Sequence, residues 1–308
     1  MVYEPVGGSA LNVADGIPLS QLSQKDSVWD DHRALADIVQ RHYAGTEFHR
    51  YAERISFCSD FLYFKLAVSG ALSLSSSRFC RVRYCPVCQW RRSCMWKSKA
   101  HLALPKVIAK YPSYRWLFLT LTIRNCAITE LRETVDHLNK SFARLTKLKN
   151  FPAVGWIKSL EVTRGKDGSA HPHFHVLLLV EPSYFAGNYY ISKNRWSELW
   201  QKCLRIDYLP ITHVRPIKED QNVTVIIPEI LKYQTKVSDL AFERNWLVIL
   251  THQMHKTRAV AVGGVLREFM HELEEEPDDL IGEGDEDTIP DLLLGFRWRT
   301  KLKKYISE

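Results

Sequence analysis

Carboxylates are missing from a long part of this sequence of 308 residues. Between Asp60 and Glu130 lie 69 residues with no Asp or Glu and with twelve Lys or Arg. The net charge of +7 hides this asymmetry, because residues 272–287 contain ten acidic residues and no basic one. A long stretch of one sign indicates a polyanionic partner, most often a nucleic acid. The alternative is a basic surface without a partner.

Long apolar runs are also absent. No stretch reaches the roughly 18 apolar residues of a membrane span, and the first residues lack the basic start and apolar core of a secretory signal. We therefore expect a cytoplasmic protein without membrane contact. Because cytoplasmic thiols are seldom paired in disulfides, the seven cysteines indicate a metal site where they cluster.

The cysteines gather in one part of the chain. "FCRVRYCPVC" has the spacing C-x4-C-x2-C at Cys80, Cys85 and Cys88, and a fourth thiolate would complete a tetrahedral structural zinc site. Cys58 is the predicted fourth ligand, with Cys94 as the alternative. Basic and aromatic residues around the cluster suit contacts with phosphates and stacking on bases. The predicted DNA-binding residues are Arg81, Arg83, Arg91 and Arg92.

Hydrophobic periodicity predicts the secondary structure. Alternation indicates strands at 115–123, 155–165, 173–180 and 212–218, and the turn residues of "RGKDGSAHP" make the middle two an antiparallel hairpin. Spacing of three and four residues indicates helices after Asp26 or Ser27, after a Thr129 cap, at 192–206 and at 227–242, with two more before the acidic run. This order predicts an α+β fold in which an antiparallel sheet has helices packed mainly on one face, preceded by a small zinc-binding module.

The stretch "HPHFHVLLLV" places two histidines on one face of a strand. Side chains two residues apart in a strand are about 7 Å apart on the same face, so His173 and His175 can bind one divalent metal ion. Pro172 marks the beginning of the strand and leaves His171 outside the pair. Glu161, on the polar face of the neighbouring strand, is the predicted third ligand. The alternatives are a hydrogen-bonded histidine pair and an ordinary solvent-facing carboxylate.

If the protein cuts phosphodiesters, it needs a nucleophile or an activated water, and one tyrosine is a candidate nucleophile. In "EILKYQTK", helical spacing places Glu229, Tyr233 and Lys236 on about one face. A free phenol has a pKa near 10, which Lys236 and a bound metal ion would both lower. The alternative is a solvated helix surface.

Taken together, "FLTLT", "HPHFHVLLLV", "EILKYQTK" and "FCRVRYCPVCQWRRS" resemble the replication initiators of small rolling-circle plasmids, in the group that pairs one tyrosine with a glutamate four residues earlier. These initiators belong to the HUH endonuclease superfamily, and the resemblance covers about residues 55–240. It implies the HUH endonuclease fold, and the N-terminal arm and the acidic tail fall outside it. We expect four parts in the chain: an arm and helix (1–54), a zinc- and DNA-binding module (55–105), a nicking and joining domain (106–271) and an acidic linker with a basic tail (272–308).

The resemblance also implies a chemistry. His173, His175 and, less firmly matched, Glu161 would hold Mn²⁺ or Mg²⁺, Tyr233 would form a 5′-phosphotyrosine, and Glu229 would activate water at termination. The implied partners are a single-stranded or hairpin origin sequence and the host helicase and polymerase, and a homodimer on the origin is compatible with this activity.

Three alternative hypotheses for the function remain. "HPHFHVL" formally satisfies the motif of histidine-triad nucleotide hydrolases, in which the middle histidine is the nucleophile and no metal is needed. A zinc-containing DNA-binding repressor would explain the charge and the cysteines without catalysis. A transposase of the single-tyrosine HUH kind is the third.

Overall fold

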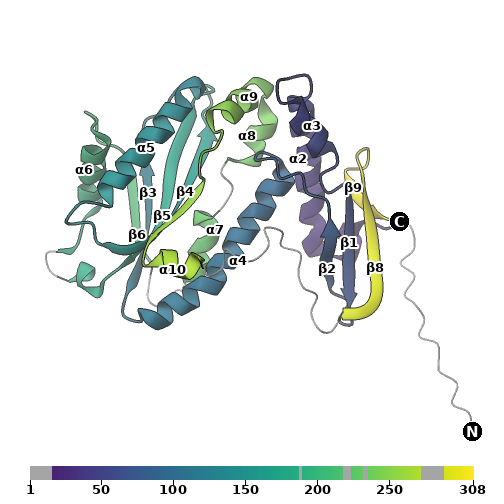
Figure 1. Cartoon of the computed structure of the whole chain (residues 1–308), viewed down its shortest axis with the longest axis horizontal. Coiled ribbons are helices and arrows are strands. Elements are labelled where there is room, and N and C mark those ends of the chain that lie inside the picture. Colours follow the sequence, from purple (N-terminus) through teal and green to yellow (C-terminus); the bar gives the residue numbers. More distant parts are fainter. Residues whose placement is uncertain (1–15, 187–188, 218–222, 232–234, 272–287) are drawn as a thin grey trace, which may run out of the picture.

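The computed structural model describes residues 16–186, 189–217, 223–231, 235–271 and 288–308. These residues form two antiparallel sheets, and the long helix α4 (Pro86–Lys110) lies between them (Figure 1). The predicted α+β fold with an antiparallel sheet is confirmed. Tyr233, the acidic run at 272–287 and the first 15 residues of the arm lie outside the described residues.

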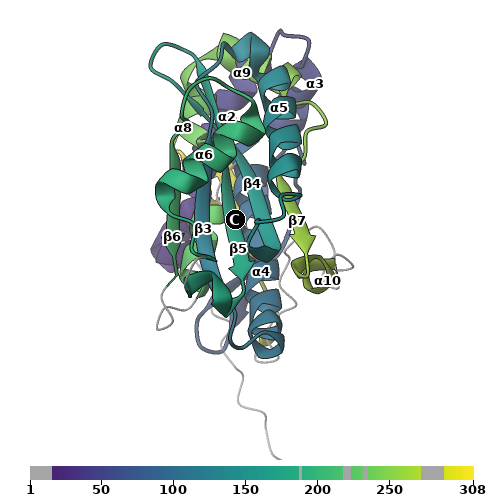
Figure 2. The same cartoon turned by 90° about the vertical axis from the view of Figure 1, so that its left-hand side faces the viewer.

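The larger sheet has the strand order β6-β3-β5-β4-β7 (Figure 2). Its strands are β3 (Arg115–Thr122), β4 (Ala153–Arg164), β5 (Ala170–Val180), β6 (Thr212–Pro216) and β7 (Val260–Gly264). β4 and β5 form the predicted hairpin, in which Glu161 is directly opposite His173 and Ser159 opposite His175. The sequence analysis missed β7, a short edge strand that pairs with β4.

One face of this sheet packs against α5 (Leu131–Leu145) and α6 (Lys193–Leu204), which lie in front of the sheet in Figure 2. The predicted apolar stripe of α5 is confirmed, since all five of its members are at most 2 % exposed. Burial of such side chains stabilises a fold by about 1.5–3 kcal/mol each. The stripe consists of Leu131, Val135, Leu138, Phe142 and Leu145.

The predicted start of α5 was wrong. A 3-10 turn, η2 (Ile128–Glu130), precedes the helix, so Glu130 and not Thr129 occupies the cap position. The sheet's other face is covered at one end by α4, α7 (Ile227–Ile230) and α10 (Leu266–His271), which bury Phe118, Leu177 and Leu179. The first residues of β5, with the two histidines, lie at the other end of this face.

The smaller sheet joins the two ends of the chain. Its order is β2-β1-β8-β9, with β1 (Phe61–Ala67), β2 (Leu72–Ser77), β8 (Thr288–Arg299) and β9 (Lys304–Ser307). Leu62 of β1 pairs with Phe296 of β8, so the segment expected as a basic tail forms two strands of this sheet. On the core side lie α2 (Val28–Tyr43), which begins after Ser27 as predicted, and α3 (His49–Ser56) (Figure 1).

The single helix predicted at 227–242 was wrong. α7 ends at Ile230, α8 (Val237–Phe242) begins after Lys236, and Lys236 itself has an extended backbone with φ −57° and ψ 133°. Glu229 and Lys236 therefore do not share one helical face. Tertiary contacts account for the break, because Ser159, Ser93 and Gln89 donate side-chain hydrogen bonds to backbone carbonyls of this segment.

The remaining elements connect these layers. They are α1 (Leu19–Leu22), η1 (Gln24–Ser27), η3 (Pro182–Phe185), η5 (Val223–Ile226) and α9 (Arg244–Gln253). None of the helices in the described ranges is long and apolar enough to cross a bilayer.

Candidate metal centres and their surroundings

The four predicted cysteines form one buried cluster. The sulfur atoms of Cys58, Cys80, Cys85 and Cys88 all lie within 4.8 Å of one another, and three of the Sγ–Sγ distances are 3.6 Å. Cys94 is not a member of this group, so the geometry favours Cys58 over Cys94 as the fourth ligand. Four soft thiolate donors at this spacing suit a tetrahedral zinc ion.

Backbone amides surround the sulfurs. The N–H groups of Cys80, Arg81 and Val82 donate to the sulfurs of Cys58, Cys88 and Cys80 at 3.3–3.5 Å. The pKa of Cys88 lies far below its ordinary value, because hydrogen bonds from the other three cysteines, Cys58 first, favour its thiolate. In contrast, hydrogen bonding with Cys80 raises the pKa of Cys58 and burial raises the pKa of Cys85, so a bound zinc ion would have to displace protons from these thiols.

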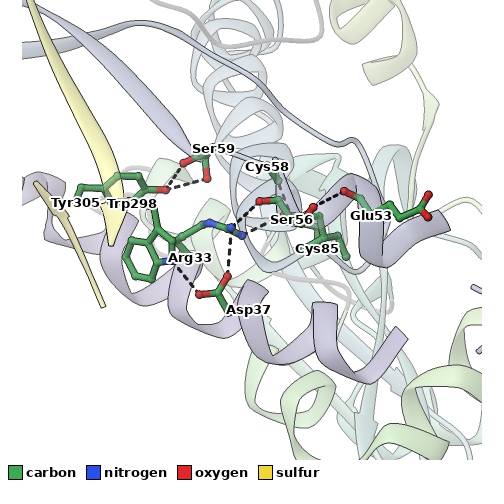
Figure 3. A network of polar contacts seen from close by, with 10 residues as sticks. Arg33, Asp37, Glu53, Ser56, Cys58, Ser59, Cys85, Trp298 and Tyr305 are labelled. Carbon is green, nitrogen blue, oxygen red and sulfur yellow. Dashed lines mark hydrogen bonds and ion pairs between the residues drawn. The ribbon is translucent and has the colours of Figure 1, made fainter. Parts of the chain in front are cut away.

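Both ends of the chain hold the segment that carries Cys58 (Figure 3). Arg33 of α2 donates to two carbonyls at the end of α3 (3.2 and 2.9 Å) and pairs with Asp37 (3.2 Å), which accepts a hydrogen bond from the Trp298 indole (2.9 Å). The Tyr305 hydroxyl donates to the Ser59 carbonyl (2.7 Å). β8, β9 and α2 therefore fix the loop next to the cluster.

The second group consists of the predicted Glu161, His173 and His175. The Nε2 atoms of the two imidazoles lie 3.2 and 2.9 Å from the same carboxylate oxygen, Oε2 of Glu161. All three residues are buried, at 3 %, 8 % and 6 % exposure. The predicted register of the hairpin places them together, because Glu161 is opposite His173 and His175 follows on the same face.

The other imidazole nitrogens are also engaged. His173 Nδ1 donates to the His171 carbonyl (3.2 Å), and His175 Nδ1 lies 3.4 Å from the Thr120 hydroxyl. The His175 ring stacks on Phe118, with centroids 5.6 Å apart. Partners at Nδ1 orient the ring and direct Nε2 at a metal ion, as in many metal sites. His171 is not in the group, since its Nδ1 bonds to Asn125 (2.8 Å).

This donor set fits a divalent metal ion. Two imidazole nitrogens and one carboxylate oxygen converge at one point and suit Mn²⁺ and related ions, with positions left for water or substrate. This group has three donor atoms where the cysteine cluster has four, and nitrogen and oxygen are harder ligands than sulfur. It therefore matches a site that acts on a ligand, whereas four thiolates leave no position for one.

The described residues on both sides of 232–234 are fixed close to this group. Ser93 of α4 donates to the Leu231 carbonyl (2.6 Å), and Gln89 donates to the Thr235 carbonyl (2.7 Å). The hydroxyl of Ser159, which is opposite His175 in the sheet, donates to the Ile230 carbonyl. Tyr233 lies between these anchored positions in the sequence and outside the described residues.

Glu229 and Lys236 are both exposed. Glu229 accepts a hydrogen bond from Arg215 of β6 at 3.0 Å, and the Arg215 guanidinium lies over the Phe118 ring, 5.5 Å from its centroid. Because Phe118 stacks on His175, these contacts connect Glu229 with the metal group across the sheet. Lys236 lies at the start of α8.

The four predicted DNA-binding arginines separate into two groups. Arg81, Arg83 and Arg92 line one cavity between α4 and β7. Arg91 instead lies over the ring of Phe79, 3.6 Å from its centroid. The sequence analysis missed Arg215, although strand alternation could have placed it on the face of the histidine pair. Thr120 belongs to the motif "FLTLT", and alternation places Ser159 on the same polar face as Glu161, but neither residue was given a role.

Comparison with known proteins gives one concordant result. The model of a family described as "Replication protein" matches residues 71–306. The chain is 36% identical to "Protein rep" of Lactiplantibacillus plantarum over 84% of this chain and 87% of the relative. It is 35% identical to "Protein rep" of Streptococcus pneumoniae (72% of each) and 30% identical to that of Bacillus amyloliquefaciens (90% and 93%). No solved structure matches.

Proposed function

Because this chain belongs to the replication protein family, we propose that it starts rolling-circle replication of a plasmid by nicking one DNA strand at the double-strand origin. The observation that supports this most is the Glu161, His173 and His175 group, beside which both flanks of Tyr233 are anchored. The proposal makes the protein a site-specific DNA endonuclease and strand transferase of the HUH type.

In the first step, the Tyr233 oxygen attacks the scissile phosphorus. The phenol releases its proton to water, a tyrosyl O–P bond forms and the P–O3′ bond breaks. The 3′ oxygen takes up a proton from water and leaves as a hydroxyl. The phosphodiester energy is kept in the 5′-phosphotyrosine, and the free 3′-OH can prime a host polymerase after a host helicase has opened the duplex. Lys236, three residues after Tyr233, is the proposed cation that lowers the pKa of the phenol.

Glu161, His173 and His175 would hold Mn²⁺ or Mg²⁺. When bound, this ion supplies Lewis-acid polarisation of the scissile phosphate. The Thr120 hydroxyl and the His171 carbonyl keep the imidazole rings oriented. Arg215, exposed on the same face, is placed to contact a phosphate oxygen of the strand.

In the last step, Glu229 is the proposed general base. It would take a proton from the water that cleaves the regenerated site, so that a second tyrosine is not needed. The Arg215 guanidinium keeps Glu229 on the side of the sheet that carries the histidine pair. The cysteine cluster, with zinc, has a structural role in this proposal.

The test is a nicking assay with supercoiled plasmid that carries the cognate origin, in the presence of Mn²⁺. Wild-type protein should yield open circles, and Tyr233→Phe and wild type with chelator should not. Nicking by Tyr233→Phe at the wild-type rate would refute the assigned nucleophile. Wild-type activity that survives the chelator would favour a mechanism without a metal ion, as in histidine-triad enzymes.

A further inference from the structure

A basic cavity lies beside strand β7, which pairs with β4, the strand that carries Glu161. It has a volume of about 730 Å³ and lies between the loop of the cysteine cluster, helix α4, strand β7 and helix α10. Five arginines line it, and no carboxylate does. The arginines are Arg81, Arg83, Arg92, Arg258 and Arg267.

Three of the five arginines have no ion pair within the described part of the chain. There, no ion pair involves Arg92, Arg258 or Arg267, and Arg258 and Arg267 are exposed. Gathering cations without counter-charges is unfavourable for the isolated protein, because like charges repel. An anionic ligand with several charges would remove this repulsion.

Tertiary hydrogen bonds hold the wall of the cavity in place. Arg83 donates to the carbonyl of Thr257 (2.7 Å) and ties the cysteine loop to the segment before β7. The same segment is fixed to β4 by the bond from Leu160 N–H to the Ala259 carbonyl (2.8 Å). The relative positions of Arg83 and Arg258 therefore depend on tertiary contacts and not on a loose loop.

An aromatic ring adds a second kind of contact. Trp96 of α4 lines the cavity one helical turn after Arg92 and is only partly buried. Proteins that bind single-stranded nucleic acids combine aromatic rings with cationic side chains, because the bases stack on the rings while the phosphates pair with the cations. An indole next to guanidinium groups is such a combination. A duplex keeps its bases stacked on one another and could use only the cations.

The cavity leads towards the proposed nicking site. Val260 of β7 is opposite Ser159 of β4, on the face that also carries Glu161, two residues further along β4. On the other side, Arg92 precedes Ser93, which anchors the Leu231 carbonyl beside Tyr233. A strand that leaves the metal group between α4 and β7 would enter the cavity within a few nucleotides.

We propose that this cavity binds a single-stranded DNA segment flanking the scissile phosphate, with phosphates on Arg92, Arg258 and Arg267 and an unpaired base on Trp96. The assignment rests on the proposed function only for the identity of the strand. Binding itself needs neither Tyr233 nor the metal ion, and it can be measured without nicking.

The test uses fluorescence anisotropy with a labelled oligothymidylate of about 12 nucleotides, within the range of single-strand sites, and full-length zinc-loaded protein without added Mn²⁺ or Mg²⁺. Arg258→Ala/Arg267→Ala should weaken binding and make the slope of log K against log salt shallower by about 1.4, since each lost single-strand phosphate contact contributes about 0.7. The matched control is Lys193→Ala/Lys202→Ala, which removes two exposed charges from α6 on the opposite face and should leave the slope unchanged.

Trp96 is tested separately. Trp96→Leu should weaken oligothymidylate binding about 5- to 150-fold, as expected for the loss of one stacked base, and should leave binding of a duplex of equal length unchanged. Photo-cross-linking of wild-type protein to an oligonucleotide with iododeoxyuridine should give a cross-link at Trp96. Because this experiment uses wild-type protein, its result does not depend on whether the Trp96→Leu variant folds.

Equal salt slopes for the arginine variant and the α6 control would overturn the proposal, as would cross-links that avoid the cavity. Equal binding of duplex and single strand, with both unaffected by Trp96→Leu, would overturn the single-strand assignment. A failure of Tyr233 to form an adduct would leave these results in place, so the two proposals fail independently.

Discussion

The two candidate metal centres of this chain differ in the number of coordination positions that they leave for a ligand. The cysteine cluster has four sulfurs and three amide donors around one point, so a bound zinc ion would have no position for a ligand. The Glu161, His173 and His175 group has only three donors, on one face of a sheet. We infer from this difference that the first centre would stabilise the fold and that the second would be available for chemistry.

The two groups also differ in which elements of the fold hold them in place. The cysteine loop is held from both ends of the chain, by α2 and by β8 and β9 (Figure 3). The histidine pair is held by its own hairpin and by β3. Removing a ligand should therefore damage stability at the first centre and activity at the second, and the predictions below test this contrast.

The largest effect is expected for Cys88→Ser. Structural zinc contributes about 10–16 kcal/mol in small zinc domains, which equals or exceeds the whole stability of a typical domain. The variant should lose zinc and become sensitive to proteolysis between α3 and α4, as measured by metal analysis and limited digestion. Cys94→Ser is the control and should keep both zinc and resistance. A Cys88→Ser protein with full zinc content and wild-type melting temperature would contradict a structural site.

Glu161→Gln should reverse this pattern. The amide keeps the shape but is a far weaker metal ligand than a carboxylate, so the nicking rate should fall at least about 100-fold, or about 3 kcal/mol. The melting temperature should change by less than about 4 °C, because no cavity is created. Glu198→Gln on exposed α6 is the control. Wild-type nicking activity in Glu161→Gln would show that the Glu161 carboxylate is not needed as a metal ligand.

Acid should weaken the fold through His32, on the side of the cysteine cluster. The His32 ring stacks on Trp90, and burial lowers the pKa of His32 to about 4. Between pH 6.5 and 4 the unfolded chain binds a proton that the folded chain does not, so stability is lost as the pH falls through this window. The loss is about 3 kcal/mol and is measured by urea unfolding from pH 7 to pH 4.5.

His32→Phe serves as the reference for this titration. It keeps an aromatic ring against Trp90 and removes the ionisable group, so the difference between the two pH profiles isolates His32 from the cysteines. Parallel profiles would show that His32 is accessible to protons in the folded state.

A small effect is expected for Thr120→Val. Its hydroxyl lies against His175 Nδ1, and the loss of such a partner weakens metal binding about 10-fold. The Mn²⁺ concentration for half-maximal nicking should rise by this factor with little change in the maximal rate. Thr122→Val, whose hydroxyl bonds to the Ile211 carbonyl instead, is the matched control. Equal shifts in both variants would argue against orientation of His175 by Thr120.

Local patterns predicted much of the fold and of the metal group. Strand alternation gave the β4–β5 hairpin and its register, and therefore the contact of Glu161 with both histidines. The apolar stripe gave α5. The four-cysteine cluster followed from spacing, although the choice of Cys58 over Cys94 needed the three-dimensional structure.

Long-range contacts explain what was missed. The pairing of β8 with β1 joins Leu62 to Phe296, and no local pattern encodes a partner so distant in sequence. The helix expected at 227–242 is interrupted because carbonyls that would accept helical hydrogen bonds accept from Ser159, Ser93 and Gln89 instead. These donors come from β4 and α4, so propensity within the segment could not reveal the break.

The most direct test of the central claim is to identify the residue that becomes linked to DNA. Purified protein is incubated with Mn²⁺ and labelled single-stranded origin fragments, digested, and analysed by mass spectrometry. The account predicts a 5′-phosphotyrosine adduct on Tyr233, absent when His173 and His175 are both replaced by alanine. An adduct on another residue, or cleavage of the fragment without any adduct, would contradict it.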